Sequence, residues 1–177
     1  ILFSFLGLVL LSPILIVLMV FGCFDTGSPI FRQERVGKGK QPFRLMKFRS
    51  MHVNAPSVAT HLANASSITT FGSFLRKSKL DELPQLFNVL MGDMSFVGPR
   101  PALFNQNDLI ALRIQYGVDA LLQGLTGWAQ VNGRDELSIS DKVRYDLEYL
   151  QKRSFWFDMK ILGLTFLKVF FRSGVSH

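Results

Sequence analysis

Two adjacent carboxylates, Asp81 and Glu82, follow a cluster of cations in the sequence, which are Arg76, Lys77 and Lys79. Nearby cations favour the ionised form of a carboxylate, and so does the start of a helix. We therefore expect lowered pKa values here, which would suit an ionised oxygen nucleophile or a pair of magnesium ligands. The simpler interpretation is that either acid caps the helix that follows.

The segment after these acids predicts the helix that positions them. Its apolar residues recur at the spacing of one helix face and are Leu83, Leu86, Phe87 and Leu90. Pro84 is tolerated only in the first turn of a helix, so we expect the helix to begin near Asp81. The two carboxylates would then lie at its positive end.

Two further cations, Lys47 and Arg49, lie on a predicted strand. Residues 31–36 and 43–51 are typical of two strands that flank a turn at residues 37–40. The two-residue period of a strand places both cations on the same face as apolar side chains, which are Phe43, Leu45 and Met51. Two cations on a mostly apolar face are unusual, and the simpler interpretation is that they lie at a solvent or lipid headgroup edge.

Two glycine-containing segments carry weaker signals for anion or nucleotide binding. Pro101 is typical of the first position of a helix, and the amides of that helix would form an anion site with the guanidinium of Arg100. Further along, Gln130, Asn132 and Arg134 alternate and could project together toward a base, a ribose or a diphosphate. A plain strand and turn explains this second pattern equally well.

The composition of the chain limits the class of protein and the kind of partner. The chain has 177 residues, is 48% hydrophobic and carries a formal net charge of +7, which favours a single domain and anionic partners. This apolar content excludes a disordered protein. The single Cys23 excludes an intrachain disulfide, and the histidines lack the spacing of a zinc site.

Residues 1–24 contain no Asp, Glu, Lys or Arg and predict a membrane helix. A helix of that length rises about 36 Å, enough for a bilayer core of about 30 Å. Pro13 frees the carbonyl of Val9 and must kink the helix, and the Ser12 hydroxyl could bond a freed carbonyl. The segment either spans the bilayer, which physics alone favours slightly, or bends and returns to the same face.

The residues on either side of this segment bear on its orientation. Residues 32–49 hold seven Lys/Arg against one acid, which places this flank in the cytoplasm. At the other end the chain begins without Met or a basic flank, so we expect it to be trimmed there.

Residues 145–171 are aromatic and apolar, with basic residues interspersed. This pattern is typical of a helix lying in the membrane interface, and a helix packed in a core is the competing interpretation. Asp158 is unexpected on such a surface and either serves the site or pairs with a cation. Asp146 is a second acid of the same kind.

Taken together, these segments resemble the small bacterial sugar transferases, which are monotopic polyprenyl-phosphate phosphoglycosyl transferases. The resemblance covers essentially the whole chain, and its motifs are weak singly but highly specific in this order. They are Ser12-Pro13, Gly27-Ser28-Pro29, and the segments at residues 47–51, 80–86, 92–101, 126–134, 158–162 and 173–175.

The resemblance implies an α+β, helix-dominated monotopic membrane protein. Residues 1–24 would form a re-entrant membrane helix broken at Ser12-Pro13, which reverses the slight preference for a span. Residues 25–177 would form a cytoplasmic catalytic domain, docked on the membrane interface, with a small β-hairpin and interfacial amphipathic helices. The implied location is the cytoplasmic face of the bacterial inner membrane.

The resemblance also implies a reaction. A UDP-sugar gives its phosphosugar to polyprenyl (undecaprenyl) phosphate through a covalent aspartyl-phosphosugar intermediate, UMP is released, and synthesis of a surface glycan begins. Asp81 would be the nucleophile, and Glu82 with Asp81 would hold Mg²⁺. The other residues implied in catalysis are Lys47, Arg76 and Asp158, and those expected to contact substrate are Arg49, Arg100, Gln130, Asn132 and Arg134.

The expected partners are a UDP-sugar, polyprenyl phosphate and membrane lipids, with no nucleic acid, and a homodimer is left open. The competing hypothesis is a non-catalytic membrane-anchored module that binds anionic lipid or nucleic acid. Such a binder has no use for two acids among cations.

The chain departs from the family pattern at Leu122-Gln123, where relatives usually carry Arg-Pro, and in the uncharged residues 53–70.

Overall fold

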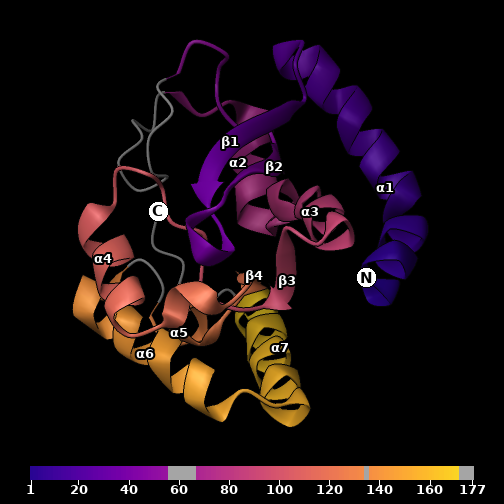
Figure 1. Cartoon of the computed structure of the whole chain (residues 1–177). Coiled ribbons are helices and arrows are strands. Elements are labelled where there is room, and N and C mark those ends of the chain that lie inside the picture. Colours follow the sequence, from indigo (N-terminus) through magenta and orange to yellow (C-terminus); the bar gives the residue numbers. More distant parts are fainter. Residues whose placement is uncertain (56–66, 134–135, 172–177) are drawn as a thin grey trace. The chain divides into compact units, whose positions relative to one another are not determined.

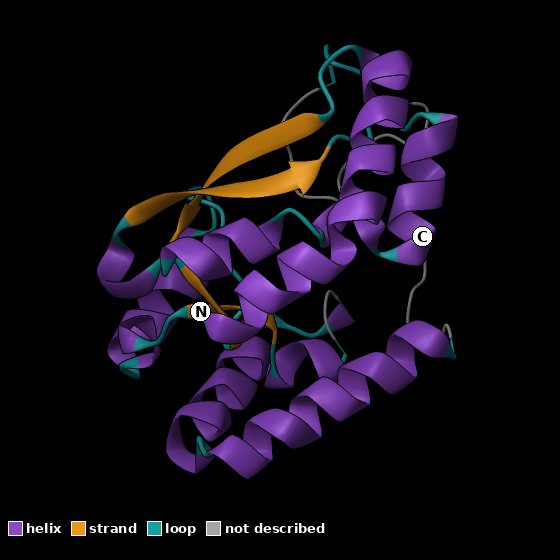
Figure 2. Ribbon diagram, turned by 90° about the vertical axis from the view of Figure 1, so that its right-hand side faces the viewer, coloured by secondary structure: helices purple, strands orange, loops and turns teal. Residues whose placement is uncertain are grey.

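A computed structural model of the chain describes residues 1–55, 67–133 and 136–171. Helices predominate, and the strands of the described part form two small two-stranded sheets, β1–β2 and β3–β4 (Figures 1 and 2). This architecture confirms the predicted helix-dominated α+β class. The chain divides into two compact units, which are Ile1–Gln33 with Arg44–Gly92, and Glu34–Phe43 with Asp93–His177.

The apolar N-terminal segment forms α1 (Leu2–Thr26), a continuous ribbon in Figure 1. In the described part of the chain it is the one helix that is long and apolar enough to cross a membrane. Pro13 lies inside it and cannot donate to the carbonyl of Val9, and the Ser12 hydroxyl donates to that carbonyl instead, at 2.7 Å. The predicted serine–carbonyl bond is therefore confirmed.

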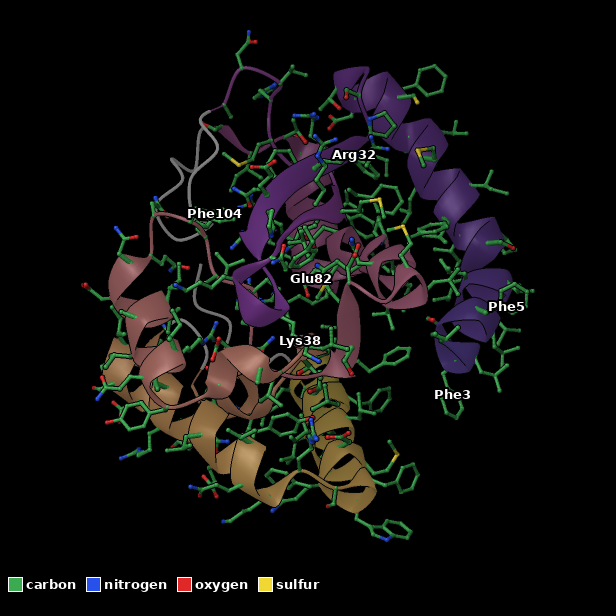
Figure 3. The ribbon with its side chains drawn as sticks, in the orientation of Figure 1. Phe3, Phe5, Arg32, Lys38, Glu82 and Phe104 are labelled. Carbon is green, nitrogen blue, oxygen red and sulfur yellow. The ribbon has the colours of Figure 1, made fainter. Side chains whose placement is uncertain are left out.

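A narrow face of α1 packs against α3 (Gln85–Met91) and buries Leu8 and Leu18. Leu18 joins the core of the first unit with Phe48 and Leu75. The other large side chains of α1 are mostly exposed and include Phe3, Phe5, Leu6, Leu10, Ile16, Phe21 and Phe24. Figure 3 labels Phe3 and Phe5 among them. An apolar surface of this extent is unfavourable in water and suits contact with lipid.

The predicted hairpin consists of β1 (Ile30–Val36) and β2 (Pro42–Phe48), joined through the 3-10 turn η1 (Lys38–Lys40). Its strand bounds differ from the prediction, because β2 ends at Phe48 and Arg49 follows the strand. The loop predicted at residues 53–70 falls largely outside the described residues. Its end leads into α2 (Thr70–Ser78), which Thr69 caps by accepting a hydrogen bond from the Gly72 amide at 2.8 Å.

In the second unit, β3 (Met94–Val97) and β4 (Gln123–Thr126) pair in parallel, with Met94 opposite Gln123. A β-carbon added at Gly98, Gly124 or Gly127 would collide with neighbouring backbone. Glycine at these positions is what lets the strands and the segments after them approach so closely.

The rest of the second unit is mainly helical. Its helices are α4 (Asn107–Gln115), η5 (Val118–Ala120), α5 (Trp128–Val131), α6 (Ile139–Lys152) and α7 (Phe155–Phe170), and α7 packs against both strands of this sheet. One core joins β3 to η5, α5, α6 and α7 and contains Val97, Val118, Leu121, Val131, Tyr149 and Ile161. α4 belongs to a separate cluster, in which its Leu109 packs with Val36, Ala102 and Val143. α7 also leaves large aromatic side chains exposed, among them Phe155, Trp156 and Phe166. Such a face suits the predicted membrane interface, and its contact with lipid stays a prediction.

Candidate active site

The carboxylate pair lies in a short 3-10 turn, η4 (Leu80–Glu82), that precedes α3. Helical backbone therefore begins near Asp81, as predicted, but as a 3-10 turn, and the α-helix itself starts later than expected. Pro84 has no N–H to give to the Leu80 carbonyl, and the Leu83 amide takes that acceptor in an i to i+3 bond of 3.2 Å. The α-helix begins only at Gln85.

Lys47 on β2 reaches this turn. Its Nζ lies 3.0 Å from Glu82 Oε1, and the two side chains are 16% and 19% exposed. The hairpin thus brings a cation to a carboxylate 35 residues away in the sequence, with most of the surface of both groups removed from water. The structure therefore joins two of the predicted catalytic residues directly.

Asn88 holds β2 and α3 together. It is fully buried, accepts from the Met46 amide at 3.0 Å, and donates to the Arg44 carbonyl at 2.9 Å. These bonds fix the strand segment that carries Lys47 relative to the helix that follows the acids. Asn88 is not among the residues predicted from the sequence, although a polar side chain in an apolar helix is a usable signal.

Arg76, in the last turn of α2, donates through Nε to the Ser50 hydroxyl at 2.8 Å. A β-carbon at Gly72 would collide with the Ser50 backbone, so glycine there allows α2 to lie close to this segment. The pKa of Arg76 is lowered, because the effect of burial outweighs the opposing effect of the negative charge of Asp81. Arg76 is thus an oriented cation whose charge acts on the carboxylate turn.

Asp81 is only 9% exposed, and its pKa is raised rather than lowered. Burial is the main cause, and repulsion from Glu82 adds to it. Lys47, Lys79 and Arg76 act in the opposite direction without overcoming these effects. The expectation of a lowered pKa is wrong, because local charges were visible in the sequence and the loss of hydration was not.

Arg49 is fixed on the segment that follows α1. Its Nε donates to the Ser28 carbonyl at 2.8 Å, its Nη2 lies 3.4 Å from the Ser28 hydroxyl, and its guanidinium lies over the Phe31 ring. All of these residues belong to the first unit, as do Asp81, Glu82, Lys47 and Arg76. The other predicted site residues that the structure describes belong to the second unit.

Arg100 follows β3 in a segment without helical structure. α4 begins at Asn107, so the prediction that Pro101 opens a helix, with an anion site at its start, is wrong. The physical reason is pairing with another strand, since the Val36 amide donates to the Ala102 carbonyl at 3.0 Å and the two residues form a bridge. The backbone there is extended.

Gln130 and Asn132 do not alternate along a strand. Gln130 lies in α5 and Asn132 directly follows it, and their side-chain amides donate to nearby carbonyls of Leu125 and Trp128 at 3.2 and 2.8 Å. These bonds to the backbone replace the predicted joint projection. Arg134 lies outside the described residues.

Asp158, in the first turn of α7, accepts a hydrogen bond of 2.9 Å from the Tyr149 hydroxyl. Tyr149 has a raised pKa because of burial and of this bond. Asp146 instead forms a buried ion pair with Arg113, at 2.7 Å. The structure therefore gives both acids partners within the second unit, and a catalytic role of Asp158 stays a prediction.

Comparison with known proteins settles the family. A family model described as bacterial sugar transferase matches residues 1–172. The chain belongs to this family. The resemblance found in the sequence motifs is thereby confirmed.

Curated relatives agree with this assignment. UDP-glucose:undecaprenyl-phosphate glucose-1-phosphate transferase of Xanthomonas campestris pv. campestris is 41% identical over 170 residues, covering 90% of this chain and 35% of that protein. The Escherichia coli (strain K12) protein of the same name is 42% identical over 173 residues, covering 92% and 37%. Uncharacterized sugar transferase EpsL of Bacillus subtilis (strain 168) is 42% identical over 152 residues, covering 85% and 75%. The chain thus spans about a third of the length of the first two relatives.

The donor set of this family member suits a lightly coordinated metal rather than a protein cage, and magnesium binding stays a prediction. Among the described residues, no group of three or more His, Cys, Asp or Glu side chains could hold a metal ion. Magnesium commonly uses only one or two carboxylates and completes its shell with water and substrate phosphates. Asp81 and Glu82 fit that requirement, while their repulsion and the burial of Asp81 leave negative charge that a cation would offset.

Proposed function

We propose that this family member transfers a phosphosugar from a UDP-sugar to polyprenyl phosphate. The observation that carries the proposal is the buried Asp81 carboxylate, set beside the Glu82–Lys47 pair and acted on by the charge of Arg76. A surface that binds anions gains nothing from two acids at its centre, whereas a covalent phosphoryl transfer needs one as nucleophile. The names of the relatives support the same donor and acceptor classes.

In the first step, a carboxylate oxygen of ionised Asp81 attacks the phosphorus that carries the sugar. The bond from that phosphorus to the bridging oxygen of the diphosphate breaks, and UMP leaves with that oxygen. The product on the protein is an aspartyl-phosphosugar. The raised pKa of Asp81 means that its charge is poorly solvated, so the carboxylate is a reactive nucleophile once it is ionised.

In the second step, a phosphate oxygen of polyprenyl phosphate attacks the same phosphorus. The bond from the phosphorus to the Asp81 oxygen breaks, which releases the lipid-linked diphosphosugar and regenerates the carboxylate. One small site can therefore serve a soluble donor and a lipid acceptor in turn.

The neighbouring residues supply charge and position. Lys47 holds Glu82 in place, and Arg76, oriented by Ser50, places positive charge near Asp81. Glu82 with Asp81 would hold magnesium, which when bound would neutralise charge on the diphosphate. In phosphoryl transfer, alignment and charge neutralisation account for most of the rate enhancement.

The proposed site works at the cytoplasmic face of the bacterial inner membrane. The supporting observations are the lipid-suited surface of α1 and the basic flank at residues 32–49. We take α1 to be re-entrant, entering and leaving at that face around Ser12-Pro13. The Ser12–Val9 hydrogen bond makes such a bend tolerable in lipid, because it partners the carbonyl that Pro13 leaves free.

A donor panel tests the proposal. The protein is incubated with magnesium, polyprenyl phosphate and, in separate reactions, UDP-glucose, UDP-galactose or UDP-N-acetylglucosamine. We expect UMP and a lipid-linked product with at least one donor, none with Asp81→Asn, and normal yield with Asp108→Asn, which changes an exposed acid of α4. Absence of UMP with every donor, or full activity of Asp81→Asn, would contradict the proposal.

A further inference from the structure

An apolar pocket of about 540 Å³ lies in the first unit, between α1, the hairpin and α3. Apolar side chains from all three elements line it, including Met19 of α1, Met46 and Phe48 of β2, and Phe87 of α3. Among the described residues that line it, Arg32 is the only charged one. Because α1 supplies one wall and presents its other faces to lipid, this pocket suits an apolar chain that enters from the bilayer.

A second pocket, of about 520 Å³, adjoins the first and shares Ile30 and Arg32 with it. It is lined by residues 27–32 and by Arg49, so that two guanidinium groups and no acid border it in the described part of the chain. Arg49 is already oriented by Ser28 and Phe31. Arg32 is exposed and has no carboxylate within ion-pair distance among the described residues (Figure 3).

An apolar pocket that continues into a cationic one matches a ligand with an apolar chain and an anionic head. Guanidinium groups bind phosphate oxygens with directed, charge-assisted hydrogen bonds. We propose that the two pockets together hold one anionic membrane phospholipid, with an acyl chain against Met19, Met46 and Phe48 and its phosphate between Arg32 and Arg49. This inference does not depend on the proposed function.

The strand that separates this site from the carboxylates favours a phospholipid over the acceptor substrate. Side chains alternate along β2, so Met46 and Phe48 line the pocket while Lys47, between them, bonds to Glu82 on the opposite face. A lipid in this pocket therefore braces the strand that carries Lys47, and neither Asp81 nor Glu82 lines either pocket. Its role is structural support of the carboxylate turn.

Lipid binding by the purified full-length chain tests this proposal without any sugar donor. The detergent-solubilised protein is titrated with phosphatidylglycerol or phosphatidylcholine, and native mass spectrometry counts bound lipid while the thermal unfolding midpoint is followed. We expect one tightly bound phosphatidylglycerol per chain, a raised midpoint, and affinity for phosphatidylcholine lower by about tenfold or more.

Paired variants locate the site. Arg32→Gln should weaken phosphatidylglycerol binding about tenfold, because it removes a charge-assisted contact, whereas Lys38→Gln at the exposed hairpin tip should not. Met19→Trp fills the apolar pocket and should prevent retention of the lipid, while Val17→Trp, on a half-exposed position of α1 outside the pocket, should not.

Two results would overturn the assignment. The first is equal binding of both phospholipids, or equal binding by each variant and its control. The second is displacement of phosphatidylglycerol by polyprenyl phosphate at less than a tenth of its concentration, which would assign the pocket to the acceptor. Neither result bears on UMP release, so failure here is distinguishable from failure of the proposed function.

Discussion

At the scale of single residues, Asp81 is buried, although the proposed reaction requires its carboxylate to be ionised. A carboxylate that is 9% exposed loses most of its hydration, and three cations only partly replace it. The ionised form that the proposed attack requires is therefore the form that the fold disfavours. Active sites commonly hold such strain at the cost of stability.

Replacing this carboxylate with a neutral isostere should stabilise the fold. The folded protein binds the Asp81 proton more tightly than the unfolded chain, whose pKa is close to 3.8, so stability falls as pH rises from that value through the folded pKa. Asp81→Asn removes this penalty. We expect its thermal unfolding midpoint at pH 7 to exceed that of the native protein, with the difference shrinking as pH falls toward 3.8.

Asp108→Asn is the matched control for this comparison, because it changes an exposed acid in the second unit. A midpoint lowered by Asp81→Asn at pH 7, or a difference that grows on acidification, would contradict the account of Asp81.

Lys47 should matter through its charge. Lys47→Met keeps the apolar stem but leaves Glu82 without the cation 3.0 Å away. Removing one preorganised electrostatic group commonly costs about a hundredfold in rate, so we expect a fall of that order in kcat/KM for the UDP-sugar. Lys40→Met, at the exposed hairpin tip, is the control, and comparable rates for the two variants would contradict a role in the site.

At the scale of elements, the site depends on how β2, α2 and the turn before α3 are held together. Asn88 bonds the backbone of β2 on both sides of Leu45, and Gly72 admits α2 close to Ser50. These contacts join segments that are far apart in the sequence. The position of Lys47 and Arg76 is thus a property of packing rather than of any local motif.

Asn88→Ala should loosen this arrangement. The change removes these two partly buried hydrogen bonds and leaves the Met46 amide and the Arg44 carbonyl without them, which we expect to cost about 1–3 kcal/mol in the free energy of unfolding. Urea denaturation measures that loss, and the rate of UMP release should fall with it because Lys47 is less well placed. Met91→Ala, at an exposed end of α3, is the control. A loss no larger than the control's would contradict the role of Asn88 in holding β2 and α3 together.

Features that depend on neighbouring residues could be predicted from the sequence, whereas features that depend on distant contacts could not. The apolar helix, the hairpin and the Ser12–Val9 bond were predictable because neighbours in the sequence cause them. The helix expected at Pro101 does not form, because Ala102 pairs with Val36, a contact across 66 residues. The predicted direction of the Asp81 pKa shift is wrong for a related reason, since burial depends on packing that no local pattern records.

At the scale of the whole molecule, the apolar helix and the carboxylate turn belong to one compact unit. Leu18 of α1 shares a core with Leu75, and Leu80 and Leu83, which flank the acids, pack against it. Insertion of α1 into lipid would therefore hold the carboxylate turn close to the membrane, where the proposed lipid acceptor would lie. Half or more of the surface of many α1 side chains remains available to lipid.

Topology of α1 can be read by labelling single cysteines in intact cells and in inverted vesicles. In a Cys23→Ser background, Phe3→Cys and Phe24→Cys place thiols at exposed positions near the two ends of the helix. The re-entrant proposal expects both thiols to react from the cytoplasmic side. Reaction of the two thiols from opposite sides would establish a span instead.

The central claim, covalent catalysis by Asp81, is tested most directly by intact-mass analysis of protein incubated with a productive UDP-sugar and magnesium, without acceptor. We predict a mass gain of one phosphosugar, located on Asp81 by peptide fragmentation, absent in Asp81→Asn, retained in Asp108→Asn, and discharged when polyprenyl phosphate is added. UMP release without such an adduct in a quenched time course, or an adduct that persists in Asp81→Asn, would contradict the account.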